Sequence, residues 1–363
     1  MQEPDLIVTC LKQRYTGVSA TVDALLPALA GLLNVGYVGS DLAGAERAQA
    51  LHPGTFRRLG LIEAIRVSAR RRARPGRLVW HVRRNHELLL AVLLRDVARL
   101  PIRVLFTSAA IRRHSAIPRW LIARADAVIA TSDRAAALVP NVAAVVPHGI
   151  DTARLAPGPG RERAWHESGL PGRHGIVIAG RVREEKGIRI FVDAMTRLLP
   201  SREDWCAVIV GRCKPEDAGF VAACRSRISE AGLQDRIRFV GEATPDEMAR
   251  WFARSTIAVA CPLYEGFGLT VIEAMACGCA VAASRTGAFE SMVVPGKTGE
   301  LVDPGSVDQL VAALAGMMAD PQRCRAMGES GRARAIRLFG LEREARAVAD
   351  VVRSIATGEG TDR

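Results

Sequence analysis

The chain has 363 residues, a formal net charge of +12, 49% hydrophobic residues and only 5% aromatic residues. Its length predicts two domains, and its longest apolar run, near residues 88–94, is far shorter than the roughly 18 residues of a membrane span. Eight scattered cysteines without zinc-ligand spacing favour buried thiols. These features exclude a membrane-spanning chain and a small disulfide-stabilised domain.

The acidic start of the chain, residues 1–5, leads directly into an apolar run, unlike a signal peptide, so we expect a cytoplasmic protein. Through the first half of the chain, short apolar runs alternate with helical patterns. The predicted strands cover 5–10, 35–38, 78–82, 102–106, 127–130 and 143–147, and a helix over 19–33 follows the Gly17 loop. Such an alternation predicts a parallel sheet with helices on its faces.

The second half repeats this alternation after a stretch rich in Pro and Gly, 156–160, which we predict to be an interdomain linker. Strands are predicted near 175–180, 206–210, 236–240, 256–260 and 279–283, and helices over 188–199, 306–319, 321–338 and 341–355. The segment from Thr244 to Glu247 is typical of a capping box at a helix start. The fold class predicted for both halves is α/β.

Glu265 and Glu273 flank the most informative loop of the chain. Glu265 follows the predicted strand 256–260, and Glu273 lies in a helix that is expected to begin near Leu269. In open α/β sheets ligands bind beyond the carboxyl ends of the strands, and a helix N-terminus offers free N–H groups to an anion. Two carboxylates on either side of a phosphate-sized gap suit a sugar nucleotide. The alternative is an exposed loop acid and a helix acid that only favours the dipole.

A second loop, from Gly180 to Gly187, follows another predicted strand and carries Arg181 and Lys186. Arginine binds phosphate oxygens as a two-pronged donor, and lysine binds them as a point charge. Lysine is rare in this chain, because only four of its 50 Lys and Arg residues are lysines. A lysine in this loop therefore stands out from the general arginine content. The alternative interpretation is a solvated run of charges.

Together these motifs resemble the family-four retaining glycosyltransferases of GT-B fold. The resemblance rests on an E-x(7)-E pattern at Glu265 and Glu273, a G-R-x(4)-K-G pattern at 180–187, the junction at 147–151, and later loops at 287–290 and 296–299. It covers about residues 147–310. The loop at 12–21 also resembles the glycine loop of one subgroup, the lipopolysaccharide core mannosyltransferases of Gram-negative bacteria.

The resemblance implies a GT-B architecture, in which two Rossmann-like, doubly wound domains face a central cleft. The expected divisions are an acceptor-binding domain over 1–153, a nucleotide-sugar-binding domain over 154–340, a helix over 341–356 that crosses back to the first domain, and a tail over 357–363. We expect the tail to be disordered.

The resemblance also assigns a donor site. Arg181 and Lys186 would bind the diphosphate, Glu265 would bind the transferred hexose, and these three are the predicted catalytic residues. Glu273 would bind the ribose. Backbone groups would complete the donor site at Gly266, Phe267, Gly268, Leu269 and Thr270, with Gly17 of the first domain approaching the phosphates. No Asp-x-Asp pattern occurs in the chain, so we predict no bound metal, and we expect no cofactor besides the nucleotide-sugar donor.

The N-terminal half carries most of the positive charge, because residues 57–124 contain seventeen arginines and three acidic residues. The predicted acceptor-binding residues lie in loops of this half: Tyr15, Thr16, Arg83, Arg84, His86, Arg112 and Arg113. Guanidinium groups match carboxylates and phosphates, so an anionic glycolipid such as lipid A carrying Kdo would suit them. The alternative is a solvated basic surface.

A helix over 63–74 would place Arg66, Arg70 and Arg74 on one stripe at four-residue spacing. Such a stripe would suit anionic lipid head groups, so we expect peripheral contact with the cytosolic face of the inner membrane. The alternative is a solvated helix face or an exposed loop.

Related enzymes often carry a histidine after the N-domain strand that here ends in Phe106-Thr107-Ser108, and this chain has none there. A histidine near a strand end is more often structural, so we assign no catalytic role to His81, His86 or His114. We expect His148 to be a structural junction residue.

The resulting hypothesis is a metal-independent retaining transferase that moves α-mannose from GDP-mannose to the Kdo-lipid A inner core of lipopolysaccharide. One alternative is a UDP-hexose donor for another envelope glycan. Nucleotide-sugar epimerases also use two such domains, but the paired motifs fit them less well. A nucleic-acid-binding protein is disfavoured, because nucleic-acid grooves interleave aromatic and basic side chains and aromatics make up only 5% of this chain.

Overall fold

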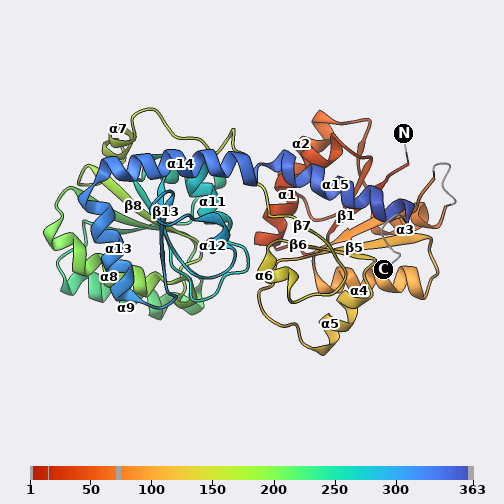
Figure 1. Ribbon diagram of the computed structural model, residues 1–363, viewed down its shortest axis with the longest axis horizontal. Helices are drawn as coiled ribbons and strands as arrows, with labels where there is room; N and C mark the ends of the chain where they lie inside the picture. Colours follow the sequence, from red (N-terminus) through yellow and green to blue (C-terminus); the bar gives the residue numbers. More distant parts are fainter. Residues whose placement is uncertain (1–2, 15, 71–74, 359–363) are drawn as a thin grey trace. The chain divides into compact units, whose positions relative to one another are not determined.

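The computed structural model of the protein describes residues 3–14, 16–70 and 75–358. Its contacts divide the chain into two compact units. Unit 1 takes in the chain up to Gly149 and again from Phe339 onward, whereas unit 2 is the continuous stretch Ile150–Leu338. Each unit contains one parallel sheet with helices on its two faces (Figure 1).

Unit 1 alternates strands and helices and is completed by the last helix of the chain. Its strands are β1 (Leu6–Cys10), β2 (Val35–Gly39), β3 (Phe56–Arg58), β4 (Leu78–Val82), β5 (Ile102–Ser108), β6 (Ala127–Ala130) and β7 (Val142–Val145). Its helices are α1 (Gly17–Ala30), α2 (Ala43–Leu51), α3 (Leu61–Ala69), α4 (Asn85–Asp96), α5 (Ala116–Ala123), α6 (Asp133–Ala136) and α15 (Leu341–Thr357).

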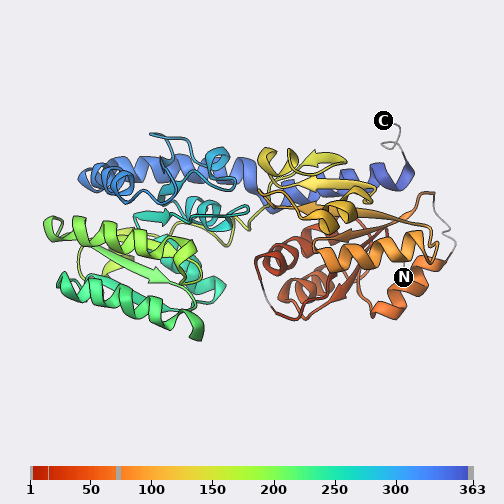
Figure 2. The same cartoon turned by 90° about the horizontal axis from the view of Figure 1, so that it is seen from below.

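The sheet of unit 1 has the strand order β3-β2-β1-β4-β5-β6-β7, with all strands parallel. The order runs outward in opposite directions from β1 and β4, so the switch point of this doubly wound sheet lies between them. One core layer joins β1, β2 and α1 to α15, which contributes Val348, Val352 and Ile355. The C-terminal helix is therefore an integral part of the first unit (Figure 2).

Unit 2 repeats the α/β alternation. Its strands are β8 (His174–Ala179), β9 (Trp205–Val210), β10 (Ile237–Gly241), β11 (Ile257–Ala260), β12 (Ala280–Ser284) and β13 (Gly299–Val302). Its helices are α7 (Arg161–His166), α8 (Ile188–Leu198), α9 (Ala218–Glu230), α10 (Pro245–Arg254), α11 (Leu269–Ala276), α12 (Phe289–Met292), α13 (Val307–Ala319) and α14 (Pro321–Phe339), with short 3₁₀ turns η1 (Glu184–Lys186), η2 (Leu199–Ser201) and η3 (Pro215–Asp217).

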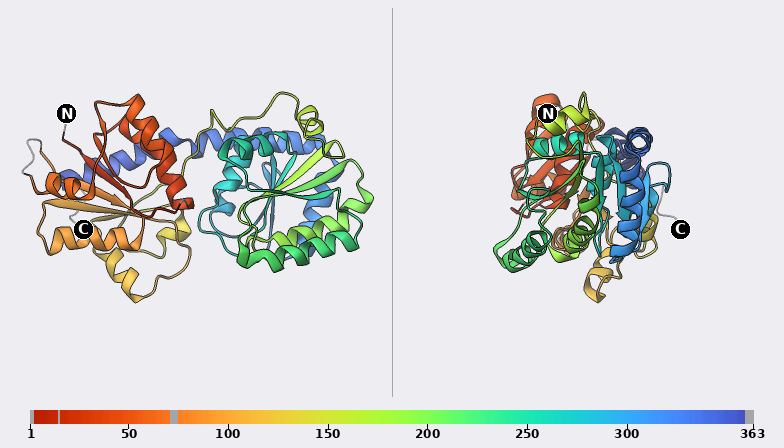
Figure 3. Two further views of the ribbon diagram at one scale, coloured as in Figure 1. Left: turned by 180° about the vertical axis from the view of Figure 1, so that it is seen from behind. Right: turned by 90° about the vertical axis from the view of Figure 1, so that its left-hand side faces the viewer.

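The sheet of unit 2 has the parallel order β10-β9-β8-β11-β12-β13, with its switch point between β8 and β11. Helices cover both faces of the sheet (Figure 3), which is why strands such as the fully buried β9 are continuous apolar runs. The predicted capping box begins α10, because Thr244 and Glu247 each accept a hydrogen bond from the other's backbone N–H. The fold-class prediction is confirmed for both units.

The sequence patterns predicted most strands within two residues of their bounds but missed the short β3 and β13. The linker prediction at 156–160 is wrong, because this stretch lies inside unit 2. It is fixed there by the next residue, Arg161, whose Nη2 donates to the carbonyl oxygens of Cys277 and Gly278 at 2.8 and 2.9 Å. Thr357 belongs to α15, and residues 359–363 of the predicted tail lie outside the described residues.

The predicted stripe of Arg66, Arg70 and Arg74 is also wrong. α3 ends at Ala69, and Arg70 already has an extended backbone, while Arg74 lies outside the described residues. Like charges at four-residue spacing would also weaken a helix that continued through these arginines. Within the described part of the chain, no helix combines the length and apolar content required to cross a bilayer.

Candidate active site

Two loops meet at the switch point of unit 2. One follows β8 and runs from Gly180 to Gly187, and the other follows β11 and leads into α11. Because β8 and β11 are paired neighbours, both loops emerge at the same edge of the sheet, where ligands of such sheets bind. The loops are in contact, since the Leu263 N–H donates to the Glu185 carbonyl oxygen at 2.9 Å.

Two glycines permit this close packing. Gly187 has a φ of 77°, and a Cβ at this position would lie 2.0 Å from the carbonyl oxygen of Cys261. Gly268 has a φ of 96°, and its Cβ would lie 2.0 Å from the ring of Phe289. Both positions combine a left-handed backbone with no room for a side chain. Only glycine fits at the points where these loops enter α8 and α11.

An ion pair between Lys186 and Glu265 lies at the centre of this site. Lys186 Nζ donates to Glu265 Oε2 at 2.6 Å, and the two side chains are only 25% and 22% exposed. The other oxygen, Glu265 Oε1, accepts from the Gly266 N–H at 3.0 Å. The carboxylate therefore has a fixed orientation, and the structure brings together two residues that were assigned separately to phosphate and hexose.

Arg181 and the start of α11 add groups that suit an anion. Arg181 is exposed and, within the described ranges, has no hydrogen-bond or ion-pair partner. α11 begins at Leu269, as predicted, with Gly268 at its N-cap and no side chain capping it. The first N–H groups of a helix have no partner within the helix, so those of Leu269 and Thr270 are available. Phe267, in the loop before α11, is buried.

Glu273 is the fifth residue of α11 and is largely buried. Burial raises the pKa of its carboxyl to about 7, and nearby Arg154 opposes this shift. Part of the side chain remains accessible. Burial makes the ionised form of this carboxyl unfavourable in the free protein. A ligand hydroxyl that donates a hydrogen bond to the carboxylate would stabilise the ionised form.

We expect this carboxyl to make unit 2 less stable as the pH rises. The pKa of Glu273 is about 7 in the folded chain, against an ordinary value of 4.5 for a glutamate, so the folded state binds more protons between these two pH values. The free energy of unfolding therefore falls as pH rises through this window. Urea unfolding between about pH 5 and about pH 8 should show wild type losing about 2 kcal/mol relative to Glu273→Gln. Parallel pH profiles for the two proteins would contradict the assignment.

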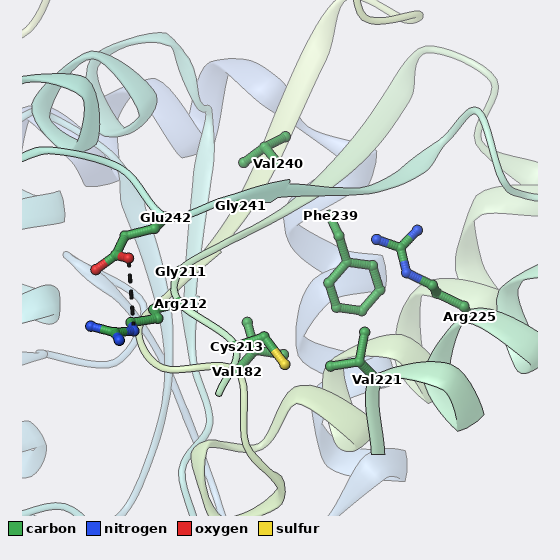
Figure 4. A pocket seen from close by; sticks show the side chains of 10 residues that line it. All are labelled: Val182, Gly211, Arg212, Cys213, Val221, Arg225, Phe239, Val240, Gly241 and Glu242. Carbon is green, nitrogen blue, oxygen red and sulfur yellow. Dashed lines mark ion pairs between the residues drawn. The ribbon is translucent and has the colours of Figure 1, made fainter. Parts of the chain in front are cut away.

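A cavity of about 590 Å³ opens beside the loop that follows β8 (Figure 4). Its lining comes from four segments: Val182, Gly211, Arg212, Cys213, Val221, Arg225, Phe239, Val240, Gly241 and Glu242. The guanidinium of Arg225 lies 4.8 Å from the centre of the Phe239 ring, and Arg212 faces Glu242 at 3.9 Å. The cavity offers both apolar and charged groups at the carboxyl edge of the sheet. Sequence patterns gave no sign of it, because its lining is assembled from distant segments.

Two predicted acceptor residues, Thr16 and Arg84, meet at the switch point of unit 1, beside Gly17 of the predicted donor site. Thr16 is the N-cap of α1, and its hydroxyl oxygen accepts from the Ser19 N–H. Arg84, which follows β4, donates from Nη2 to Thr16 Oγ1 at 2.9 Å and to Ser19 Oγ at 3.0 Å. Gly17 begins α1 and borders open space. These loops therefore form one polar cluster that includes a helix N-terminus.

Glu87 orients this cluster and is not among the residues predicted from the sequence. Its fully buried carboxylate accepts from the Thr9 hydroxyl at 3.2 Å and from the Leu11 N–H at 3.0 Å, and it lies 3.4 Å from Arg84 Nη1. It thereby fixes the end of β1 relative to Arg84. One signal was available, because Glu87 is one of only three acidic residues in the arginine-rich segment 57–124.

Arg83 requires a correction. Its side chain is buried, donates to the Thr21 hydroxyl at 2.9 Å and lies 3.8 Å from Glu344. Burial lowers the pKa of Arg83, with Glu344 opposing the shift. The predicted role in acceptor binding does not fit a side chain inside the core, and we interpret Arg83 as a structural charge.

The remaining predicted acceptor residues are either exposed to solvent or outside the described residues. His86, Arg112 and Arg113 are exposed. Tyr15 lies outside the described residues.

Two histidines have structural surroundings. His81 is fully buried with Nε2 2.7 Å from Thr107 Oγ1, and burial holds its pKa well below the usual value. His148 lies with Nδ1 3.0 Å from Glu344 Oε1. Both contacts lie within unit 1, and neither supports a catalytic role.

Comparisons with known proteins extend these observations over the whole chain. A family model described as glycosyl transferases group 1 matches residues 165–334. The lipopolysaccharide core biosynthesis mannosyltransferase LpcC of Rhizobium leguminosarum bv. viciae is 40% identical over 356 residues, which cover 98% of this chain and 97% of that protein. The corresponding enzyme LpsB of Rhizobium meliloti is 40% identical over 365 residues, which cover 98% of this chain and 99% of that protein.

A solved structure supports the fold assignment. Alr3699/HepE of Anabaena, in complex with UDP and glucose, matches with a TM-score of 0.79 and covers 96% of this chain and 99% of its own, at 17% identity. At that identity the likeness concerns the fold alone. The relatives of 40% identity cover both units, including the switch-point loops. The chain therefore belongs to the group 1 glycosyltransferases of GT-B fold.

Proposed function

We propose that this protein is a retaining mannosyltransferase that moves α-mannose from GDP-mannose to the Kdo-lipid A inner core of lipopolysaccharide. The similarity to the two rhizobial lipopolysaccharide core mannosyltransferases supports this choice of sugar and pathway, because it runs over nearly the full length of all three chains. The enzyme would act in the cytoplasm, as a peripheral protein at the cytosolic face of the inner membrane.

The observation that carries the proposal is the Lys186–Glu265 pair at the switch point of unit 2. A sugar diphosphate brings an anion and hydroxyl donors on one molecule, and this pair offers a cation and an acceptor side by side. The diphosphate would bind Lys186, Arg181 and the N–H groups at the start of α11. Hexose hydroxyls would donate to Glu265, and ribose hydroxyls would donate to Glu273.

The proposed chemistry retains the configuration of the anomeric carbon. The bond from that carbon to the diphosphate oxygen breaks, and the acceptor oxygen bonds to the same face of the carbon. The leaving diphosphate takes the proton of the acceptor hydroxyl. Lys186 and Arg181 would stabilise the negative charge that develops on the leaving group, and Glu265 would hold the hexose in position.

The acceptor would bind through unit 1. Arg84 already interacts with hydroxyl oxygens of Thr16 and Ser19 at the N-terminus of α1. His86 in the first turn of α4 and Arg112 and Arg113 in the loop after β5 are exposed. Together with Arg84 they would offer donors for carboxylates and phosphates. Lipid A carrying Kdo has both kinds of group. The second candidate function is transfer from a UDP-hexose to another envelope glycan, for which the same cations would serve.

A donor screen separates the two candidates. We expect GDP and GDP-mannose to raise the melting temperature by about 5 °C or more at roughly a hundred-fold excess over their dissociation constants, with UDP and UDP-hexoses giving much smaller shifts. The same preparation should transfer labelled mannose from GDP-mannose to Kdo-lipid A in the presence of EDTA, because two cations and a helix N-terminus can carry the diphosphate charge.

Three controls make this screen decisive. ADP and GDP-glucose report on selectivity for base and hexose, and heat-treated protein reports on non-enzymatic transfer. Stabilisation by UDP-hexoses in place of GDP-mannose would overturn the proposed donor in favour of the second candidate. Loss of transfer in EDTA and its recovery with magnesium or manganese would overturn the metal-independent mechanism.

A further inference from the structure

The solvent-facing side of α4 is apolar. Leu89, Leu93 and Val97, which follows the last residue of α4, recur at four-residue spacing and so lie on one side of the helix. Their exposed fractions run from 42% for Leu89 to 72% for Val97. The opposite side of α4 is buried in the core of unit 1. A helix on a protein surface normally presents polar residues to solvent, so folding alone does not account for this stripe.

α5 packs against α4 and adds two exposed apolar side chains, Ile117 at 73% and Trp120 at 55%. Arg124 connects the helices. Its guanidinium lies 4.6 Å from the centre of the Trp120 ring, and its Nη1 lies 3.7 Å from Asp96 Oδ2 at the end of α4. We name the combined surface the α4–α5 face, made of Leu89, Leu93, Val97, Ile117 and Trp120.

Arginines border this face and outnumber the acidic residues beside it, of which Asp96 pairs with Arg95 and Arg124. From residue 97 to residue 124 the sequence contains six arginines and no Asp or Glu. Four of these arginines, at 112, 113, 119 and 124, are exposed and lie on or next to α5. An indole ring among aliphatic side chains suits the boundary between head groups and acyl chains. Surrounding guanidinium groups suit the phosphates of anionic lipids.

We propose that the α4–α5 face docks the protein on an anionic lipid bilayer, with Trp120 and Leu93 entering the head-group region. Charge favours this occupant over a second copy of the chain, because two copies would bring their arginine borders together. This docking surface is separate from the arginine stripe predicted at Arg66. That stripe does not form, because α3 ends at Ala69. This inference rests on the proposed function in one respect: the proposed glycolipid acceptor is located in such a bilayer.

Vesicle sedimentation of the full chain, without donor or acceptor, tests the proposal. Wild type should sediment with vesicles of phosphatidylcholine and phosphatidylglycerol at low salt, and not with phosphatidylcholine alone. The double variant Leu93→Ser, Trp120→Ser should bind at least roughly ten-fold more weakly, and Arg119→Glu should weaken binding in a salt-dependent way. Leu51→Ser removes a leucine of α2 that is 66% exposed and serves as the matched control, with unchanged binding.

A measurement of tryptophan fluorescence complements the sedimentation assay. Brominated lipids should quench Trp120 on binding, because Trp80, Trp165 and Trp205 are buried. Trp251 is partly buried, so Trp120→Phe, which should abolish most of the quenching, assigns the signal to the α4–α5 face.

Unchanged sedimentation of the double variant, or no sedimentation of wild type with anionic vesicles, would overturn the proposal. A wild-type dimer that the double variant abolishes, without lipid binding, would assign the face to a second copy instead. Vesicle binding with no mannose transfer would count against the proposed function and leave this inference standing.

Discussion

Lys186→Ala is expected to lower the affinity for GDP by about ten- to a hundred-fold, because a charge-assisted contact to phosphate contributes roughly 1.5–3 kcal/mol. Transfer should fall further than binding, because the same charge would stabilise the leaving diphosphate. The variant also leaves Glu265, 2.6 Å away in the wild type, without its cation. Calorimetric titration with GDP and a single-turnover transfer assay measure the two effects separately.

Companion variants separate the roles within the site. Arg181→Ala should weaken GDP in the same direction, whereas Glu265→Gln should impair transfer and spare GDP affinity, because the hexose is absent from GDP. Arg197→Ala is a suitable control: it removes a cation at the far end of α8 that pairs with Asp308 on the surface. Unchanged GDP affinity in both Lys186→Ala and Arg181→Ala would show that the diphosphate binds elsewhere.

Glu344→Ala is expected to destabilise unit 1 by about 3–5 kcal/mol, the usual effect of removing one partner from a buried charge pair. The Glu344 carboxylate is 3% exposed. It accepts from the Gly149 N–H at 2.7 Å and lies 3.0 Å from His148 Nδ1 and 3.8 Å from Arg83. Without it, the guanidinium of Arg83 and the N–H of Gly149 would remain in the core without this acceptor.

Urea unfolding followed by far-ultraviolet circular dichroism measures this loss. Glu342→Ala changes an exposed carboxylate in the same turn of α15, and its effect should stay within about 0.5 kcal/mol. Glu344→Gln keeps a polar group that can accept one hydrogen bond, so it should fall between the two. Equal unfolding midpoints for Glu344→Ala and Glu342→Ala would refute a structural role for this carboxylate.

The donor site could be predicted because each of its motifs is local. Gly180 to Gly187 and the loop before α11 each follow an apolar strand and precede a helix, and α/β sheets bind ligands beyond such strand ends. The ion pair between Lys186 and Glu265 could not be predicted in the same way. The two residues are 79 positions apart in the sequence. Their contact depends on the pairing of β8 with β11, and no local sequence pattern predicts that pairing.

The site in unit 1 was harder to predict because neighbouring residues have opposite surroundings. Arg83 and Arg84 were assigned together, but successive side chains leaving a strand point in different directions. Arg83 enters the core toward Thr21 and Glu344, whereas Arg84 reaches the N-terminus of α1. Composition alone showed two arginines in a basic segment. Only long-range contacts, such as that of Glu87 with Leu11 at a separation of 76 residues, distinguish the structural charge from the accessible one.

The chain order of the two units has a consequence for biosynthesis. Unit 2 is one continuous stretch, but unit 1 requires α15, which supplies Val348, Val352 and Ile355 to its core. A ribosome therefore completes unit 2 while unit 1 still lacks its last helix, although the residues of unit 1 emerge first. Until α15 has been synthesised and has left the ribosome, the apolar side of α1 that it covers remains open to chaperones and proteases. For the same reason, residues 150–338 form a natural fragment for separate expression, and residues 1–149 do not.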